Sequence, residues 1–299
     1  MGSAITVIGL PVALGIIMFG LGLSLTPGDF VRIGLRPKAV AVALACQLIV
    51  LPLVCFGLVL LFRLPPVLAV GMMLLAASPG GTTANLYSHL FRGDVALNIS
   101  LTAINSVIAV ITLPVVVNLS LAVLQPGGDQ VGLQLSKTIE VFMIVLAPVA
   151  LGMLVRGVKP GFADAMDKPV RLASVVILTL VIIGAVSAQF DVLMSNLGAL
   201  AGIVVTFCVL SLGIGFLAPR LLKIDRPQSI ASAFEVGLHN ATLAIVIARS
   251  VLQNPDMSLP AAVYGVLMFP LAAAFGVLIT RGRARGDDNG AGYPPRSSE

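Results

Sequence analysis

The chain has 299 residues, of which 58% are hydrophobic and only 10% carry a charge. Because soluble domains usually contain about 25% charged residues, this composition excludes an ordinary soluble protein. A mean hydropathy of +1.06 indicates an integral membrane protein whose surroundings are a lipid bilayer. The net charge of +5 does not indicate nucleic-acid binding, since the sequence has no basic patch interleaved with aromatic residues.

Apolar runs of about 20 residues, the length that a helix needs to cross the hydrocarbon core, recur along the whole chain. Short connections rich in Lys, Arg, Pro or Gly separate them. We count nine predicted spans, at 5–25, 39–62, 67–91, 95–120, 136–157, 170–188, 199–219, 228–252 and 259–280. The predicted fold is therefore an all-α integral membrane protein with nine transmembrane helices.

The basic residues give the orientation of these spans. When the loops are assigned to alternate sides, 15 of the 18 Lys and Arg residues fall on one side, and Arg63, Lys137 and Arg249 fall on the other. Excess Lys and Arg marks the cytoplasmic side, so we expect the N-terminus outside and the C-terminus in the cytoplasm. The short loops and the tail are typical of a bacterial protein of the cell inner (plasma) membrane. Residues 281–299, rich in Arg, Gly, Asp, Pro and Ser, are expected to form a disordered cytoplasmic tail.

Two of the predicted spans are interrupted in the middle. The third contains Ser-Pro-Gly-Gly-Thr-Thr-Ala-Asn at 78–85, and the eighth contains Glu-Val-Gly-Leu-His-Asn at 235–240. In hydrocarbon every backbone amide and carbonyl needs a partner, so irregular backbone at membrane depth survives only where it lines a cavity or is buried in protein. Paired interruptions in the two halves of a chain indicate the substrate and ion site of a secondary transporter.

Pairing spans 1–4 with spans 6–9 aligns the two interruptions and leaves the fifth span unpaired. Each span then crosses in the opposite sense to its partner, which is the geometry of inverted-topology repeats, here of four and five spans. The alternative is that the alignment is a coincidence, because direct sequence identity between the halves is weak. If the repeat holds, the half-helices beginning near Asn85 and Asn240 favour an anion at their N-termini, and freed carbonyls favour a small cation.

Glu235 lies near the centre of a predicted span, where a charge costs about 2.5–3.5 kcal/mol on insertion scales, so it is a functional candidate. The alternative is a protonated structural glutamate. Neutral oxygens in the same membrane zone come from Gln47, Asn85, Asn98, Thr102, Asn105 and Asn240. For each of these the alternative is an interhelical hydrogen bond. One carboxylate with hard neutral oxygens favours an alkali cation over zinc or copper.

His239 follows Glu235 by four residues, a spacing that can place two metal ligands on one helix face. A transition-metal site is the weaker interpretation, since Gly237 indicates unwound backbone and no third ligand is evident. An intramembrane enzyme with these two residues as acid and base lacks a nucleophile, so we expect no enzyme. A receptor or a structural protein is a further alternative.

Several motifs resemble the bile acid:sodium symporter family, over nearly the whole chain. They are Gly-Ile-Ile-Met-Phe-Gly at 15–20, Leu-Thr-Pro-Gly-Asp-Phe at 25–30, Pro-Gly-Gly-Thr at 79–82, Gly-Asp-Val-Ala-Leu at 93–97 and Glu-Val-Gly at 235–237. The resemblance implies two discontinuous crossed helices inside a core domain, at 39–120 and 199–280. It also implies a panel domain, at 1–25 and 136–188, against which the core moves.

The resemblance further implies one or two Na⁺ ions near the crossing. The first site would use Asn85, Asn98, Thr102 and Glu235, with Ala84 alongside. The second would use Gln47, Glu235, His239 and the backbone oxygens of Val236 and Leu238. This chain departs from the family at Ala84 and Asn98, where serine is frequent, and at His239, where glutamine is typical. We hypothesise that His239 weakens or replaces the second sodium.

The expected function is sodium-coupled symport of an organic anion, a small monocarboxylate or a bile-acid-like molecule, by alternating access. Its carboxylate is expected near Thr82, Thr83 and Asn240. Met268 and Phe269 form a wall that is polar in some bacterial relatives, so this wall of the pocket is expected to be less polar. An alternative is a proton-coupled organic anion transporter that uses Glu235 and His239. No obligate protein partner is predicted.

Overall fold

The computed structural model describes residues 10–28, 34, 36–125, 135–188 and 190–281. Within these ranges the regular secondary structure is helical, and the one β-type contact is a bridge between Gly80 and His239. The predicted all-α class is therefore confirmed. The first residues of the first predicted span, 5–9, and nearly all of the predicted tail, 282–299, lie outside the described residues.

The first half of the chain begins with α2, at Leu10–Ser24, and continues with a long helix in three parts: α4, at Pro37–Ala45, η2, at Cys46–Val50, and α5, at Leu51–Leu61. The middle part is a π-helical turn, in which the Leu51 amide donates to the Cys46 carbonyl five residues back. Pro52 explains this turn, because it has no amide hydrogen and its ring crowds the carbonyl four residues before it. The widened turn carries Gln47.

Helix boundaries fall at both predicted interruptions. In the first, α6, at Pro66–Ala77, ends before Ser78, and α7, at Thr82–Leu90, starts after Gly81. In the second, α13, at Arg226–Gly237, ends before Leu238, and α14, at Ala241–Val246, runs on into the π-helical turn η3, at Ile247–Val251. Pro79 explains the first stop, since the residue before a proline is disfavoured in helical conformation; Ser78 has ψ 139°.

The remaining helices are mostly long. They are α8 at Val95–Leu124, α9 at Leu135–Val158, α10 at Pro160–Ala188, α11 at Phe190–Ser195, α12 at Leu197–Leu221, the short η4 at Asp256–Ser258 and α15 at Leu259–Arg281. Among the described residues, four helical stretches are long and apolar enough to cross a membrane: Pro37–Leu61, Val95–Leu124, Leu197–Leu221 and Asp256–Arg281. Shorter apolar stretches lie at Leu14–Ser24, Pro66–Ala77, Leu146–Val158 and Ala241–Val251, so the total of nine spans stays a prediction.

The long helix α8 shows how such a helix divides its faces. Val107, Ile111, Val115 and Leu119 recur every fourth residue and are 51–71% exposed. Residues at this spacing share one face of a helix. A fully apolar outer face on a helix whose other face buries Asn98 is typical of a helix that contacts lipid.

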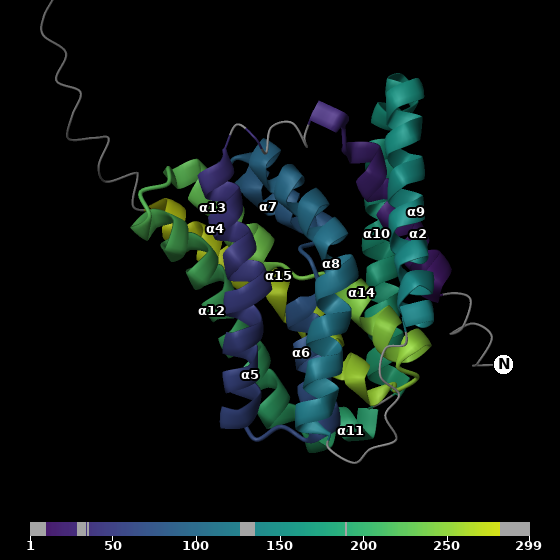
Figure 1. Ribbon diagram of the computed structural model, residues 1–299, viewed down its shortest axis with the longest axis vertical. Helices are drawn as coiled ribbons and strands as arrows, with labels where there is room; N and C mark the ends of the chain where they lie inside the picture. The colour runs from purple at the N-terminus through teal and green to yellow at the C-terminus, as the bar shows by residue number, and fades with distance from the viewer. Residues whose placement is uncertain (1–9, 29–33, 35, 126–134, 189, 282–299) are drawn as a thin grey trace, which may run out of the picture.

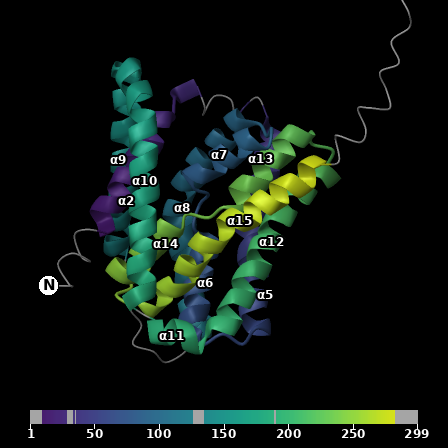
Figure 2. The same ribbon diagram turned by 180° about the vertical axis from the view of Figure 1, so that it is seen from behind.

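The helices form two groups that lie beside each other (Figures 1 and 2). In both views α2, α9 and α10 run side by side at one edge of the molecule. Gly22 and Gly152 allow the backbones of α2 and α9 to approach closely, because a Cβ on either one would collide with backbone atoms of the other helix. The other helices form the larger group, which contacts this edge mainly through α14, α15, α8 and η3.

Within the larger group, α7 and α13 lie toward one end of the molecule, while α6 and α14 lie toward the other (Figure 1).

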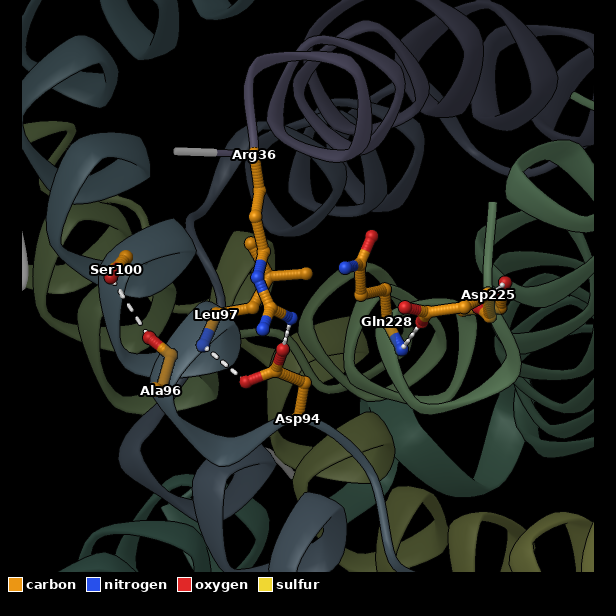
Figure 3. Close-up of polar contacts among 8 residues, drawn as sticks. Arg36, Asp94, Ala96, Leu97, Ser100, Asp225 and Gln228 are labelled. Carbon is orange, nitrogen blue, oxygen red and sulfur yellow. Dashed lines mark hydrogen bonds and ion pairs between the residues drawn. The ribbon is translucent and has the colours of Figure 1, made fainter. Parts of the chain in front are cut away.

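The α7–α8 turn is fixed at its end by Asp94. The Asp94 carboxylate accepts from the Leu97 amide at 3.1 Å as the N-cap of α8 and also pairs with Arg36 (Figure 3). The Asp94 amide donates to the Pro227 carbonyl at 2.9 Å, which ties this turn to the start of α13. Asp225 caps α13 in the same way.

Candidate functional site

The two interruptions satisfy each other's backbone. The Gly81 amide donates to the Leu238 carbonyl at 3.0 Å, and the Asn240 amide donates to the Pro79 carbonyl at 2.9 Å. These two bonds form the bridge between the break of α6 and α7 and the break of α13 and α14. Because buried backbone groups without partners are costly, the interruptions persist as a pair.

Glu235 lies in the last turn of α13, 2% exposed, directly against the first interruption. A Cβ at position 80 would overlap the carboxylate, with the Glu235 Cδ at 2.5 Å and Oε2 at 2.6 Å, so Gly80 is required for this approach. Oε2 accepts a hydrogen bond of 2.5 Å from Thr102 Oγ1. Oε1 is buried and has no donor in the part of the chain that the structure describes.

Helix α8 presents Asn98 and Thr102 to α13 on one face, as their spacing predicts. The Asn98 amide nitrogen donates to the Ala231 carbonyl at 2.8 Å, which turns the side-chain oxygen away from that bond. Thr102 also has the Asn98 carbonyl at 3.1 Å as an alternative acceptor for its single hydrogen. The Asn98 Oδ1 is buried and has no donor among the described residues.

Helix α7 contributes Ala84 and Asn85 from its first turn. Ala84 is fully buried, and its amide donates to the Gly81 carbonyl at 3.0 Å. The Asn85 Oδ1 is a third buried oxygen for which the described chain offers no donor. Because α7, α8 and α13 contact one another, three helices bring acceptor oxygens and a carboxylate to the same region. Buried acceptors without donors are costly unless a proton donor or a cation satisfies them.

His239 and Gln47 meet at the Ser78 carbonyl, at the start of the first interruption. His239 Nδ1 lies 3.2 Å from the Ser78 carbonyl; since a carbonyl only accepts, this bond places the hydrogen on Nδ1. The Gln47 Nε2 donates to the same carbonyl at 3.0 Å and lies 3.4 Å from the ring nitrogen. The imidazole stacks on Phe207, with centroids 5.3 Å apart and planes 16° apart, and Tyr264 lies edge-on at 5.4 Å.

The backbone positions expected beside His239 are buried but differ in their roles. Val236 lies in the last turn of α13, one residue after Glu235, and is fully buried. The Leu238 carbonyl already accepts from Gly81. The carbonyl of Gly237, between them, accepts from the Tyr264 hydroxyl at 2.7 Å.

The residues expected to hold the substrate are less closely grouped. The Asn240 side chain is the N-cap of α14 and accepts from the Leu243 amide at 3.0 Å. Thr83 is partly exposed in the first turn of α7, and the side chain of Thr82 lies outside the described part of the chain.

The predicted wall on α15 divides into a buried residue and a partly buried one. Met268 is 2% exposed and packs in the core, and Phe269 is partly buried. The Phe269 carbonyl accepts from the Tyr87 hydroxyl at 2.9 Å. This bond brings α15 against α7.

Two residues next to the site were not predicted from the sequence: Phe207 and Tyr264, which enclose the imidazole. Gly80 belongs to the predicted interruption, but its role of making room for the carboxylate was not predicted. Tyr264 had a signal, because a tyrosine inside an apolar span needs a partner for its hydroxyl. Phe207 had none. No group of three or more His, Cys, Asp and Glu side chains lies together in the described ranges.

Comparison with known proteins places the chain among transporters rather than enzymes. Residues 11–196 match the model of the Sodium Bile acid symporter family. An uncharacterized sodium-dependent transporter of Bacillus subtilis, YocS, is 31% identical over 85% of this chain and 77% of its own length. The probable sodium/metabolite cotransporter BASS1 of Arabidopsis thaliana is 33% identical over 85% of this chain, which spans 62% of that relative. The human ileal sodium/bile acid cotransporter is 24% identical over 89% of this chain and 77% of its own length. The chain therefore belongs to the sodium bile acid symporter family.

Proposed function

We propose that the protein is a secondary transporter that carries an organic anion together with sodium by alternating access. The observation that supports this most directly is the set of buried oxygens beside Glu235. Glu235 Oε1, Asn85 Oδ1 and Asn98 Oδ1 have no donor in the described chain. A hard cation prefers oxygen ligands, and it would satisfy all three while neutralising the carboxylate.

The relatives support sodium as that cation. The printed names of the proteins from Bacillus subtilis, Arabidopsis thaliana and human all include sodium. Two of them are named as cotransporters, one of a metabolite and one of bile acid. For this chain we propose an organic monoanion, with a small carboxylate preferred over a bile acid.

The helix register supports an inverted repeat. Leu197 follows Pro37 by 160 residues, and each begins an apolar helical stretch of 25 residues. Arg226 follows Pro66 by the same 160 residues, and each begins a half-helix of 12 residues that stops at an interruption. Spans 2 and 7, and spans 3 and 8, are thus alike in length and spacing, as the pairing of spans 1–4 with 6–9 predicts.

The turns between these helices repeat as well. Arg63 and Lys223, again 160 residues apart, have φ of 51° and 60°. The residue after each donates to a carbonyl five residues back, Leu64 to Val59 at 3.2 Å and Ile224 to Pro219 at 2.9 Å. Both are left-handed helix caps of the same kind, which supports a common ancestry for the two halves.

The packing supports the division into panel and core. The panel, 1–25 and 136–188, corresponds to α2, α9 and α10, which contact one another closely. The core, 39–120 and 199–280, contains both interruptions. Movement of one group against the other would open the crossing to one side of the membrane and then to the opposite side. In this arrangement nine spans place the N-terminus outside and the C-terminus in the cytoplasm of a cell inner membrane.

The N-terminal turn of α7 supports an anion site beside the cation. Thr82 and Thr83 begin this half-helix, and the positive end of a helix dipole favours a carboxylate. Asn240 lies at the matching start of α14, with its side-chain oxygen directed to its own helix, so its amide nitrogen is the group that could meet the substrate.

Thermal unfolding of the purified protein in detergent, with sodium against potassium or choline, tests the proposal. A ligand that binds only the folded state stabilises it by about 2.7 kcal/mol at a hundredfold excess over Kd. We expect a rise in the unfolding midpoint that is specific to sodium and that is lost in Glu235→Gln. Ser120→Ala is the control, because its hydroxyl bonds only its own helix at Val116. Sodium-independent uptake that follows a pH gradient would instead establish the proton-coupled alternative.

A further inference from the structure

We infer that the crossing binds a single sodium ion, on the side of Glu235, and that His239 fills the opposite side with internal hydrogen bonds and ring contacts. This inference rests on the proposed function and assigns its ion stoichiometry. Its basis is that buried oxygens without a hydrogen-bond donor gather on the side of Glu235, whereas most oxygens on the side of His239 have one.

The side of Glu235 has more buried acceptor oxygens than its hydrogen bonds satisfy. Thr102 donates to Glu235 Oε2, and the Asn105 side chain and the Gly80 backbone also lie beside the carboxyl group, but Oε1 has no hydrogen-bond donor in good geometry among the described residues. The side-chain oxygens of Asn85 and Asn98 are also buried without a hydrogen-bond donor in the described part of the chain. The Asn98 amide nitrogen is held by the Ala231 carbonyl, so its oxygen cannot be exchanged for a donor by a simple flip. A cation is what these acceptors lack.

On the side of His239 most backbone oxygens of the interruptions already have donors. The Ser78 carbonyl accepts from both Gln47 and His239. Donors also reach the carbonyls of Pro79, Gly81, Gly237, Leu238 and His239, from Asn240, Ala84, Tyr264, Gly81 and Ala241 respectively. A carbonyl oxygen has two lone pairs, so the Ser78 carbonyl, with two donors, has none left for a cation. The other carbonyls keep one lone pair each, and a donor on the first lone pair weakens the attraction of the oxygen for a cation on the second.

The imidazole itself offers no oxygen. It lies between the face of Phe207 and the edge of Tyr264, two apolar surfaces that cannot replace the hydration shell of an ion. The Gln47 Oε1 and the His239 Nε2 are the side-chain acceptors of these two residues left without a donor in the described chain. One neutral oxygen and one imidazole nitrogen are a poor ligand set for a hard cation such as sodium, which prefers oxygen. His239 therefore holds the two interruptions together without an ion.

Equilibrium binding of radioactive sodium to the purified protein in detergent tests the count directly. We expect one ion per chain in the wild type and none in Glu235→Gln. His239→Gln replaces the ring with an amide oxygen at similar reach next to Gln47, and we expect it to raise the count to two. His239→Phe keeps the aromatic contacts without any acceptor, and we expect the count to stay at one.

The outcomes separate this inference from the proposed function. Two ions in the wild type would overturn the inference and leave sodium coupling intact, whereas no sodium binding at all would overturn the proposed function. A count of zero in His239→Phe would place the ion at the histidine and refute the assignment. A count of one in His239→Gln would show that His239 is not what excludes a second ion. Size-exclusion chromatography of each variant limits the comparison to folded protein.

Discussion

The contact between Gly80 and the Glu235 carboxylate gives the sharpest test of the site geometry, through Gly80→Ala. The added methyl would overlap three atoms of the carboxyl group, with Cδ at 2.5 Å and Oε2 at 2.6 Å. Both residues are buried, and Gly80 is fixed by its bridge to His239. The backbone therefore cannot move away without breaking the contact between the two interruptions.

The cost can be worked out for either response of the site. If the carboxylate stays, overpacking of a filled interior costs about 1–3 kcal/mol. If it rotates away, the hydrogen bond from Thr102 is lost, which for a charged acceptor costs about 1.5–3 kcal/mol. Both responses move Glu235 Oε1 out of the proposed ion site, so we expect sodium affinity to fall by at least about tenfold, which corresponds to about 1.4 kcal/mol.

Gly81→Ala is the matched control for this prediction. A Cβ at position 81 would meet Thr83 Oγ1 at 3.6 Å and the Leu238 carbonyl oxygen at 3.9 Å, which are ordinary contacts. Its φ of −104° and ψ of 167° are open to alanine, so we expect a stability change within about 0.5 kcal/mol. Thermal unfolding of both variants at increasing sodium concentration is the assay. If Gly80→Ala and the wild type needed the same sodium concentration for half of the stabilisation, the placement of Glu235 against the interruption would be refuted.

Two further predictions concern the groups around this contact. Thr102→Val keeps the shape of the side chain but removes the donor to Glu235, so we expect a loss of about 1.5–3 kcal/mol in stability. In the same thermal titration, we expect the sodium concentration that gives half of the stabilisation to rise. An unchanged value would exclude Thr102 from the ion site. Asp94→Ala removes the N-cap of α8 and the ion pair drawn in Figure 3, and we expect it to cost about 0.5–2 kcal/mol for the cap. Asp94→Asn retains a capping oxygen and loses only the partly exposed ion pair with Arg36, which is worth about 0–1 kcal/mol. Denaturant unfolding measures both variants. Similar losses of stability in the two would contradict the larger share that we assign to the cap.

The interruptions could be predicted from the sequence because their cause is local. Pro79 and the glycines at 80, 81 and 237 stand inside apolar runs, and their effect on helix geometry does not depend on distant contacts. The shared face of Asn98 and Thr102 follows in the same way from helical periodicity. Both features are present in the structure.

The surroundings of His239 could not be predicted in this way. Phe207 and Tyr264 lie 32 and 25 residues from it in the chain and reach it only through the packing of α12 and α15. The position of Gln47 depends on a π-helical turn. Pro52, the cause of this turn, is local in the sequence, but the exact form of the turn is not determined locally. Which oxygens keep a donor, and which do not, depends on these long-range contacts.

The proposed cation site lies next to the proposed anion site, which gives a physical reason for the coupling that we propose between the two ligands. Without a cation, the side of Glu235 holds a carboxylate and further acceptor oxygens, all of which repel an anionic substrate at the neighbouring start of α7. Since the environment is of low dielectric, that repulsion is large compared with the same charges in water. In the proposed site a bound sodium ion would cancel the charge and tie α7, α8 and α13 together, so each ligand would favour the state that binds the other. A carboxylate substrate should therefore bind more tightly in sodium than in potassium, and sodium more tightly in its presence, by the same factor.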